Sequence, residues 1–296
     1  MGHVNQPKAY LLALFTVLFW STVATAFKIA LRDLNYIQVL LIANSVSLVV
    51  YSMILLFRSQ RVSVPPLSGR SVALSALQGF LNPFAYYLII FKVYSILPAQ
   101  IAQPANFIWP VVLMLLSAYL LKQPVRLTGV IALIISFTGV LILSSQGNLL
   151  HYRIKEPAGI ALALFSSVIW SLFWIINLKD KRDDVAKLFM SALFSMVFIF
   201  ILALATGNLS GYHTKSMLAA IYIGLFEMGI TFVLWLKALS LSESTGRVSN
   251  LVYLTPFVSL LFIHTILGEK IYYTSLIGLC LIVGGILIQQ IKKDPR

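Results

Sequence analysis

Charged residues are scarce in this sequence, since Asp, Glu, Lys and Arg together make up 10% of its 296 residues. Soluble domains carry about 25% charged residues. Hydrophobic residues reach 59%, and the mean hydropathy is +0.92. A water-soluble core cannot accommodate that much apolar surface. The composition therefore excludes a soluble globular domain and indicates a protein embedded in a lipid bilayer.

Cysteine and the signatures of enzymes are also lacking. The single cysteine, Cys280, excludes an intrachain disulfide and leaves no thiolate cluster for a metal. The sequence contains no His-Glu-x-x-His, no Gly-x-Ser-x-Gly and no phosphate-binding glycine loop. We therefore expect no cofactor, no metal and no enzymatic activity, and we expect transport to be driven by an ion or substrate gradient.

Ten apolar stretches fill almost the whole chain. A helix that crosses the bilayer needs about 20 apolar residues at a rise of about 1.5 Å per residue, and most of the stretches approach that length. They lack the two-residue alternation of membrane strands, so the predicted fold class is all-α with ten transmembrane helices. The predicted spans are 10–30, 36–57, 72–91, 99–121, 127–143, 159–178, 186–206, 217–238, 245–267 and 272–291.

The second five spans repeat the first five. Ala-Leu-Phe-Thr at 13–16, followed by Trp20-Ser21, returns as Ala-Leu-Phe-Ser at 163–166, followed by Trp170-Ser171. Prolines at 110 and 256 align the fourth and ninth spans. Because five is an odd number, the second repeat enters the membrane inverted, as in alternating-access transporters. The predicted repeats are 10–143 and 159–289, with the polar stretch 146–157 between them.

These features resemble the EamA family of the drug/metabolite transporter superfamily. The resemblance rests on Phe19-Trp20-Ser21, Phe27-Lys28, the proline-centred fourth helix of each half and Gly268-Glu269. It implies a ten-helix permease or exporter whose central cavity is formed by the third and fourth helices of both halves, with the first and sixth. The first half departs from the pattern, because Lys122-Gln123 replaces the Gly-Glu pair.

The net charge of +13 does not indicate nucleic acid, because the basic residues are distributed by topology. An even number of spans places both termini on one side of the membrane. Under the positive-inside rule the side with more Lys and Arg is cytoplasmic. We therefore expect a protein of the plasma (inner) membrane with both termini in the cytoplasm. Only seven of the 22 Lys and Arg residues fall on the other side: Lys28, Arg32, Lys92, Arg153, Lys155, Lys215 and Lys270.

Glu227 is the only one of nine acidic residues that falls in the middle of a span. An ionised side chain there costs about 2.5 to 3.5 kcal/mol on insertion scales, which predicts a wet cavity, a partner or a bound proton. We interpret Glu227 as a site for H⁺ or for a cationic substrate; the alternative is a protonated structural hydrogen bond. Asn82, beside Pro83, is its counterpart in the third span, and lines the cavity or forms a packing kink.

Polar residues three apart mark both proline-containing helices. Gln100, Gln103 and Asn106 lie in the fourth span, and Asn250 and Tyr253 follow an interfacial Arg247 in the ninth. Matched stripes favour a pore lining, with interhelical hydrogen bonding as the alternative.

Aromatic residues, 12% of the chain, supply further candidates for a cavity wall. Trp170 and Trp174 lie one turn apart in the sixth span, and Tyr86 lies in the third. Such walls suit planar or cationic solutes, while packing and interfacial belts are the alternative.

We expect a secondary active transporter that exports a small organic metabolite, an amino acid or related amine, by alternating access, with H⁺ as the candidate coupling ion. The alternatives are an uncoupled facilitator or importer of a nucleoside-like or aromatic solute, and a non-transporting membrane sensor. The expected partners are the small-molecule substrate and the lipid bilayer, and we expect no binding to nucleic acid. A homodimer is compatible with the sequence.

Overall fold

The computed structural model describes residues 5–57, 68–120, 127–148, 156–209, 214–242, 248 and 250–290. These residues are helical with short connections, and they contain no strand. Six helical stretches are long and apolar enough to cross a membrane, and shorter apolar helices complete ten segments. The all-α prediction and the count of ten are confirmed.

Six segments are single helices: α1 (Gln6–Ala30), α2 (Tyr36–Phe57), α7 (Leu127–Ser144), α8 (Pro157–Lys179), α9 (Asp184–Ala205) and α14 (Tyr273–Gln290). The other four are interrupted. The third segment joins α3 (Gly69–Gly79), η1 (Phe80–Ala85) and α4 (Tyr86–Ile96), and the fourth joins α5 (Ala99–Asn106) and α6 (Trp109–Leu120). The eighth joins α10 (Thr214–Ile223), η2 (Gly224–Gly229) and α11 (Ile230–Leu241), and the ninth joins η3 (Asn250–Leu254) and α13 (Thr255–Leu267).

The interruptions occur at equivalent places in the two halves, and proline explains three of them. Proline lacks the N–H that a helix needs four residues after a carbonyl. Pro110 and Pro256 are each the second residue of a new helix, α6 and α13, and Pro83 lies inside η1, where Asn82 leaves helical geometry. The eighth segment has no proline and breaks at Gly229, whose backbone is also non-helical.

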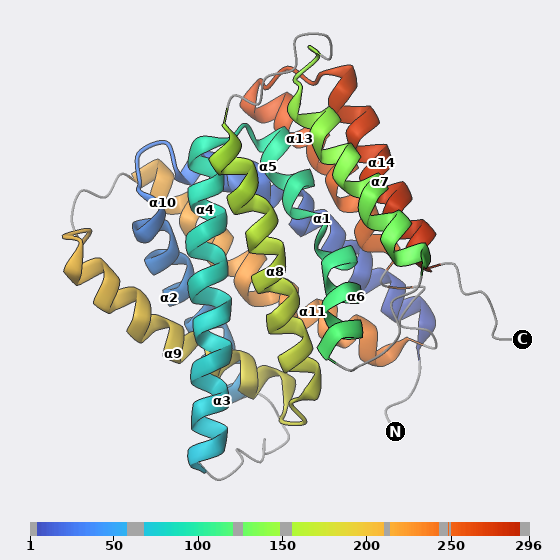
Figure 1. The fold of residues 1–296 in the computed structure, drawn as a ribbon. Coiled ribbons are helices and arrows are strands. Elements are labelled where there is room, and N and C mark those ends of the chain that lie inside the picture. Colours follow the sequence, from blue (N-terminus) through green and yellow to red (C-terminus); the bar gives the residue numbers. More distant parts are fainter. Residues whose placement is uncertain are drawn as a thin grey trace, which may run out of the picture.

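The first helix of each half packs into the other half. Helix α1 contacts α10, α11 and α13, while α8 contacts α4, α5 and α6. The second helices pair as α2 with α9, and the fifth helices pair as α7 with α14 (Figure 1). This reciprocal arrangement is the packing expected of two inverted repeats, and it brings both ends of the chain into one core.

Two equivalent glycines allow close approach beside the interruptions. A Cβ atom at Gly79 would lie 2.4 Å from the carbonyl oxygen of Ser191 in α9. A Cβ atom at Gly224 would lie 2.5 Å from the carbonyl oxygen of Ala43 in α2. Any larger residue would push the π-helical segments η1 and η2 away from these neighbours.

The two ends of the bundle are held by different polar contacts. We call the end where α1 begins and α14 ends the terminal face, and the other end the distal face (Figure 1). At the terminal face Arg182 binds Asp180 at 2.6 Å and Ser75 Oγ at 2.7 Å. Burial opposes ionisation of Asp180, but hydrogen bonds and charge from Arg182 outweigh it and lower the pKa of Asp180. At the distal face Ser216 donates to Asp33 at 2.6 Å.

Candidate functional site

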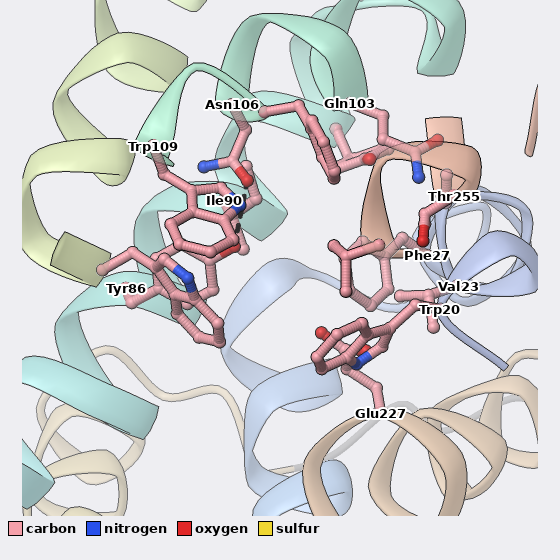
Figure 2. A pocket seen from close by; sticks show the side chains of 15 residues that line it. Trp20, Val23, Phe27, Tyr86, Ile90, Gln103, Asn106, Trp109, Glu227 and Thr255 are labelled. Atoms are coloured by element: carbon pink, nitrogen blue, oxygen red, sulfur yellow. Dashed lines mark hydrogen bonds between the residues drawn. The ribbon is translucent and has the colours of Figure 1, made fainter. Parts of the chain in front are cut away.

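A central cavity lies where the interrupted segments meet α1 and α8 (Figure 2). The cavity volume is about 90 Å³. One water molecule needs roughly 10–15 Å³ on this measure, so the cavity has room for several waters or for a small ligand group. The lining residues are Trp20, Val23, Ala24, Phe27, Tyr86, Ile90, Tyr94, Gln103, Asn106, Phe107, Trp109, Trp170, Glu227, Val252 and Thr255.

Glu227 supplies the only carboxyl group of this lining. Its segment η2 is π-helical, a local widening that is frequent at functional sites. The side chain is 8% exposed, and Oε1 accepts a hydrogen bond of 3.0 Å from the hydroxyl of Tyr87. Oε2 is buried and has no hydrogen-bond partner among the described residues. An acceptor in this state is available to a ligand or to a proton.

We call the side of the cavity formed by Gln103 and Asn106 the amide side, and the side formed by Glu227 the carboxyl side. The amide side is held by hydrogen bonds between helices. Tyr86 donates to Asn106 Oδ1 at 3.1 Å, and Asn106 Nδ2 donates to Ser166 Oγ at 2.7 Å. Gln103 Oε1 accepts from the hydroxyl of Ser259, which turns the amide nitrogen of Gln103 toward the cavity in Figure 2. Because its acceptor oxygen is engaged by Ser259, Gln103 presents its amide N–H groups to the cavity, whereas Asn106 already uses one N–H group on Ser166.

Aromatic rings form the wall between the carboxyl and amide sides. Trp170 contacts Tyr86 with ring centroids 4.6 Å apart and Trp109 with centroids 6.4 Å apart. The buried indole Nε1 of Trp170 has no partner among the described residues. Trp20 lies beside Glu227 on the opposite wall (Figure 2). The wall therefore offers π-faces together with one unengaged N–H donor.

Toward the terminal face the cavity ends at packed aromatic rings. Trp20 contacts Trp235 with centroids 5.6 Å apart, and Phe232 stacks on Trp174 at 6.3 Å. Phe232 and Trp235 lie in α11 beyond Glu227 in the direction of the terminal face. These rings separate the central cavity from that face.

Toward the distal face the central cavity has a neighbouring cavity. Tyr94 lines both the central cavity and a distal cavity that also contains Lys28, Arg32 and Glu269. Phe27 and Tyr94 meet edge to face at 5.0 Å. Tyr94 is therefore the side chain that the central and distal cavities share.

Lys28 and Glu269 fix the connection between α4 and α5. Lys28 Nζ donates to the carbonyl oxygens of Tyr94 and Leu97, at 2.9 and 3.0 Å. Glu269 accepts from the backbone nitrogens of Ala99 and Gln100, at 2.9 and 3.2 Å. A cation thus caps the carboxyl end of one helix, and an anion caps the amino end of the next.

The structure brings five of the predicted site residues together around the cavity: Tyr86, Gln103, Asn106, Trp170 and Glu227. Asn82, Trp174 and Tyr253 are not among its lining residues. Trp174 packs behind Trp170 and Phe232, while Tyr253 contacts Phe107 at 6.4 Å. The side chain of Asn250 and the whole of Arg247 lie outside the described residues.

Asn82 and Gln100 show why equivalent or evenly spaced positions do not all reach one cavity. Asn82 is 4% exposed in η1, a segment that packs against α9, and its Oδ1 has no partner among the described residues. Gln100 lies three residues before Gln103, and each step of three turns the side chain about 60° around the helix. Gln100 therefore points to α14, where it binds Ser275 at 2.8 Å.

Sequence reasoning missed the direct partner of Glu227. Tyr86 and Tyr87 are adjacent, and their side chains differ by about 100° around the helix. Only Tyr87 contacts the carboxyl group, and nothing in the sequence distinguishes the two. Phe27 and Tyr94 were missed because an apolar stretch gives no signal for a constriction.

Comparison with known proteins places the chain among transporters. The profile of the EamA-like transporter family matches residues 7–145 and 157–289, one match for each half. An uncharacterized transporter of Clostridium kluyveri is 23% identical over 96% of this chain and 93% of its own length. One of Archaeoglobus fulgidus is 23% identical over 97% of this chain and 99% of its own.

Two further similarities agree with this result. The uncharacterized transporter YvbV of Bacillus subtilis is 28% identical over 68% of this chain and 66% of its own length. A solved structure described only as a crystal structure of a protein superposes with a TM-score of 0.68 at 19% identity, covering 97% of this chain and 99% of the other. At that identity the superposition supports the fold alone.

Proposed function

The chain belongs to the EamA-like transporter family, and from this premise we propose that it is a proton-coupled exporter of a small organic metabolite. The proposed solute is an amino acid or a related amine, moved by alternating access across a plasma (inner) membrane. The distribution of Lys and Arg supports cytoplasmic termini, so in this proposal the terminal face is the cytoplasmic one.

One observation carries the coupling: Glu227 lines the central cavity, and its buried Oε2 has no hydrogen-bond partner among the described residues. An ionised carboxylate binds an ammonium group, and a protonated carboxyl group does not. Substrate and H⁺ therefore compete for one group, and each displaces the other. In a membrane whose outside is more acidic, a proton arriving from outside releases the substrate there, which gives export.

The two barriers support alternating access around this carboxyl group. Aromatic rings of α1, α8 and α11 close the cytoplasmic side, and Phe27 with Tyr94 forms the external barrier. Interrupted helices at equivalent positions in the two halves provide the hinges that alternating access requires.

The proposal that substrate and H⁺ compete for Glu227 is tested by measuring the protons released when a ligand binds. Purified protein in weakly buffered detergent solution is mixed with amino acids and amines at a series of pH values, and a dye reports released protons. Any ligand that binds should release protons from the wild type at pH values where the free carboxyl group is protonated. Glu227→Gln keeps the shape of the side chain but cannot release a proton, so its signal should vanish.

Two results would count against the proposal. Ligand binding without proton release at every pH would make the protein an uncoupled facilitator, for which the aromatic wall is the supporting observation. Equal proton release from the Glu227→Gln variant would assign the proton to another group.

A further inference from the structure

The central cavity has opposite chemistry at its two sides. Figure 2 shows Glu227 on one side and the amides of Gln103 and Asn106 on the other, with the space for a ligand between them. Glu227 offers a free carboxylate oxygen, while Gln103 offers amide N–H groups because its oxygen is held by Ser259. One side thus accepts hydrogen bonds and attracts a cation, and the other donates hydrogen bonds.

Aromatic side chains line the space between Glu227 and the two amides. Trp20, Tyr86, Trp109 and Trp170 line the space, and the indole Nε1 of Trp170 is buried without a described partner. Rings of this kind bind planar or apolar bodies and attract cations to their faces. Trp170 adds one more donor, so the wall also favours an oxygen or nitrogen acceptor on the ligand.

The described lining contains no Lys, Arg or His. A ligand carboxylate in this cavity would lose its water and would meet no positive charge among these residues. Burial of an unpaired charge is the costliest change a ligand can bring to a site. It would also face repulsion from the carboxylate of Glu227. The same cavity satisfies an ammonium group through the free oxygen of Glu227.

We propose that the substrates are organic cations with one ammonium group and an apolar or planar body, that an uncharged hydrogen-bond acceptor strengthens their binding, and that amino acids with a free carboxylate are rejected. The ammonium lies at Glu227, the body lies between the tryptophans, and the acceptor meets Gln103. This assignment rests on the proposed function, and it narrows the proposed solute, an amino acid or a related amine, to the amine.

The test compares matched sets of three ligands that differ at one position. Tyramine, tyrosinamide and tyrosine form one set; tryptamine, tryptophanamide and tryptophan form a second; isoamylamine, leucinamide and leucine form a third. Each ligand is titrated against the purified full-length protein, and its affinity is taken from the rise in melting temperature. In at least one set the amine and the amide should bind, with the amino acid weaker by about tenfold or more.

Two variants test which group of the ligand each side of the cavity binds. Glu227→Gln should weaken the amines by about tenfold or more, because a charge-assisted hydrogen bond is lost. Gln103→Leu should remove the preference for tyramine over phenethylamine, which lacks the hydroxyl acceptor. It should leave the affinity for phenethylamine within about threefold of the wild type. A binding effect limited to one ligand in Gln103→Leu cannot arise from misfolding.

The class is wrong if an amino acid stabilises the protein as strongly as its amine, or if none of the nine ligands stabilises it. Amino acid binding that disappears in Arg247→Gln would assign carboxylate recognition to a cation outside the described lining, and would also overturn the proposal. Failure of this kind is distinct from failure of the proposed function, because any ligand that binds can still be tested for proton release.

Discussion

Within the part of the chain that the structure describes, the carboxyl group of Glu227 receives one hydrogen bond, from Tyr87, and its other oxygen has no partner. A carboxyl group fixed at one oxygen in this way would keep its orientation during the exchange of a proton for a ligand that we propose. Tyr51 supports the same place by donating to the backbone oxygen of Met228, the next residue along. The residue that binds and the residues that orient it therefore come from three different segments.

A double-mutant cycle tests whether Tyr87, and not the adjacent Tyr86, is energetically coupled to Glu227. Tyr87→Phe should weaken amine binding by about tenfold in the wild type, because a hydrogen bond to a charged group is worth about 1.5 to 3 kcal/mol. In a Glu227→Gln background the same change should cost clearly less. Tyr86→Phe, which loses its bond to Asn106, should have the same effect in both backgrounds. Equal effects of Tyr87→Phe in the two backgrounds would contradict the described contact.

For single residues, the sequence shows which side chain is unusual in its span more readily than it shows which side chains that residue contacts. Glu227 stands out because an acidic residue in mid-membrane is costly, and Glu227 is among the residues that line the cavity. Asn82 was selected by symmetry with Glu227, but it is buried in η1 and is not among the lining residues. The difference arises because the internal symmetry relates backbones, while the side chains of the two halves have diverged.

Among the elements, the interrupted helices set the shape of the cavity. Pro110 and Pro256 divide the fourth and ninth segments where the cavity lies, and their breaks could be predicted from the missing N–H group. The break at Gly229 could not, because an isolated glycine in an apolar stretch is also compatible with a regular helix. Helix ends extend beyond the apolar stretches, as in α4, where Lys28 caps the carbonyl groups.

Gly224 tests the packing of the π-helical segment η2. Gly224→Ala would place a Cβ atom against Ala43 and Val46 of α2, so we expect overpacking of about 1 to 3 kcal/mol. The melting temperature of the purified protein should fall by roughly 2 to 10 °C. Gly284→Ala is the matched control, since a Cβ atom there meets nothing within 4 Å and alanine favours a helix. An equal fall in both variants would contradict the close contact.

On the scale of the whole molecule, the exchange of first helices links the two halves. Helices α1 and α8 each line the cavity while packing against the opposite repeat. The inverted repeat could be predicted from the odd number of spans and the shared motif at 13–16 and 163–166. The reciprocal exchange and the aromatic contacts at the two ends of the cavity could not, because they depend on long-range contacts that leave no periodic pattern.

The relation between these halves offers a mechanical basis for the proton-coupled exchange that we propose. In that proposal, moving one half against the other would open the aromatic contact of Trp20 and Trp235 and close the one at Phe27 and Tyr94. Glu227 lines the cavity between these contacts, so it would meet each side of the membrane in turn. A proton and a substrate would then cross only in opposite directions.

The most direct test is gradient-driven transport by purified protein in liposomes, using the tightest-binding labelled ligand of the panel and protein-free liposomes to correct for passive movement of neutral amine. An imposed pH gradient should drive the wild-type protein to concentrate the ligand in the more acidic compartment. Glu227→Gln, with a similar melting temperature, should lose this accumulation while still exchanging labelled for unlabelled ligand at raised concentration. Gradient-driven accumulation at the wild-type level in Glu227→Gln would contradict the account.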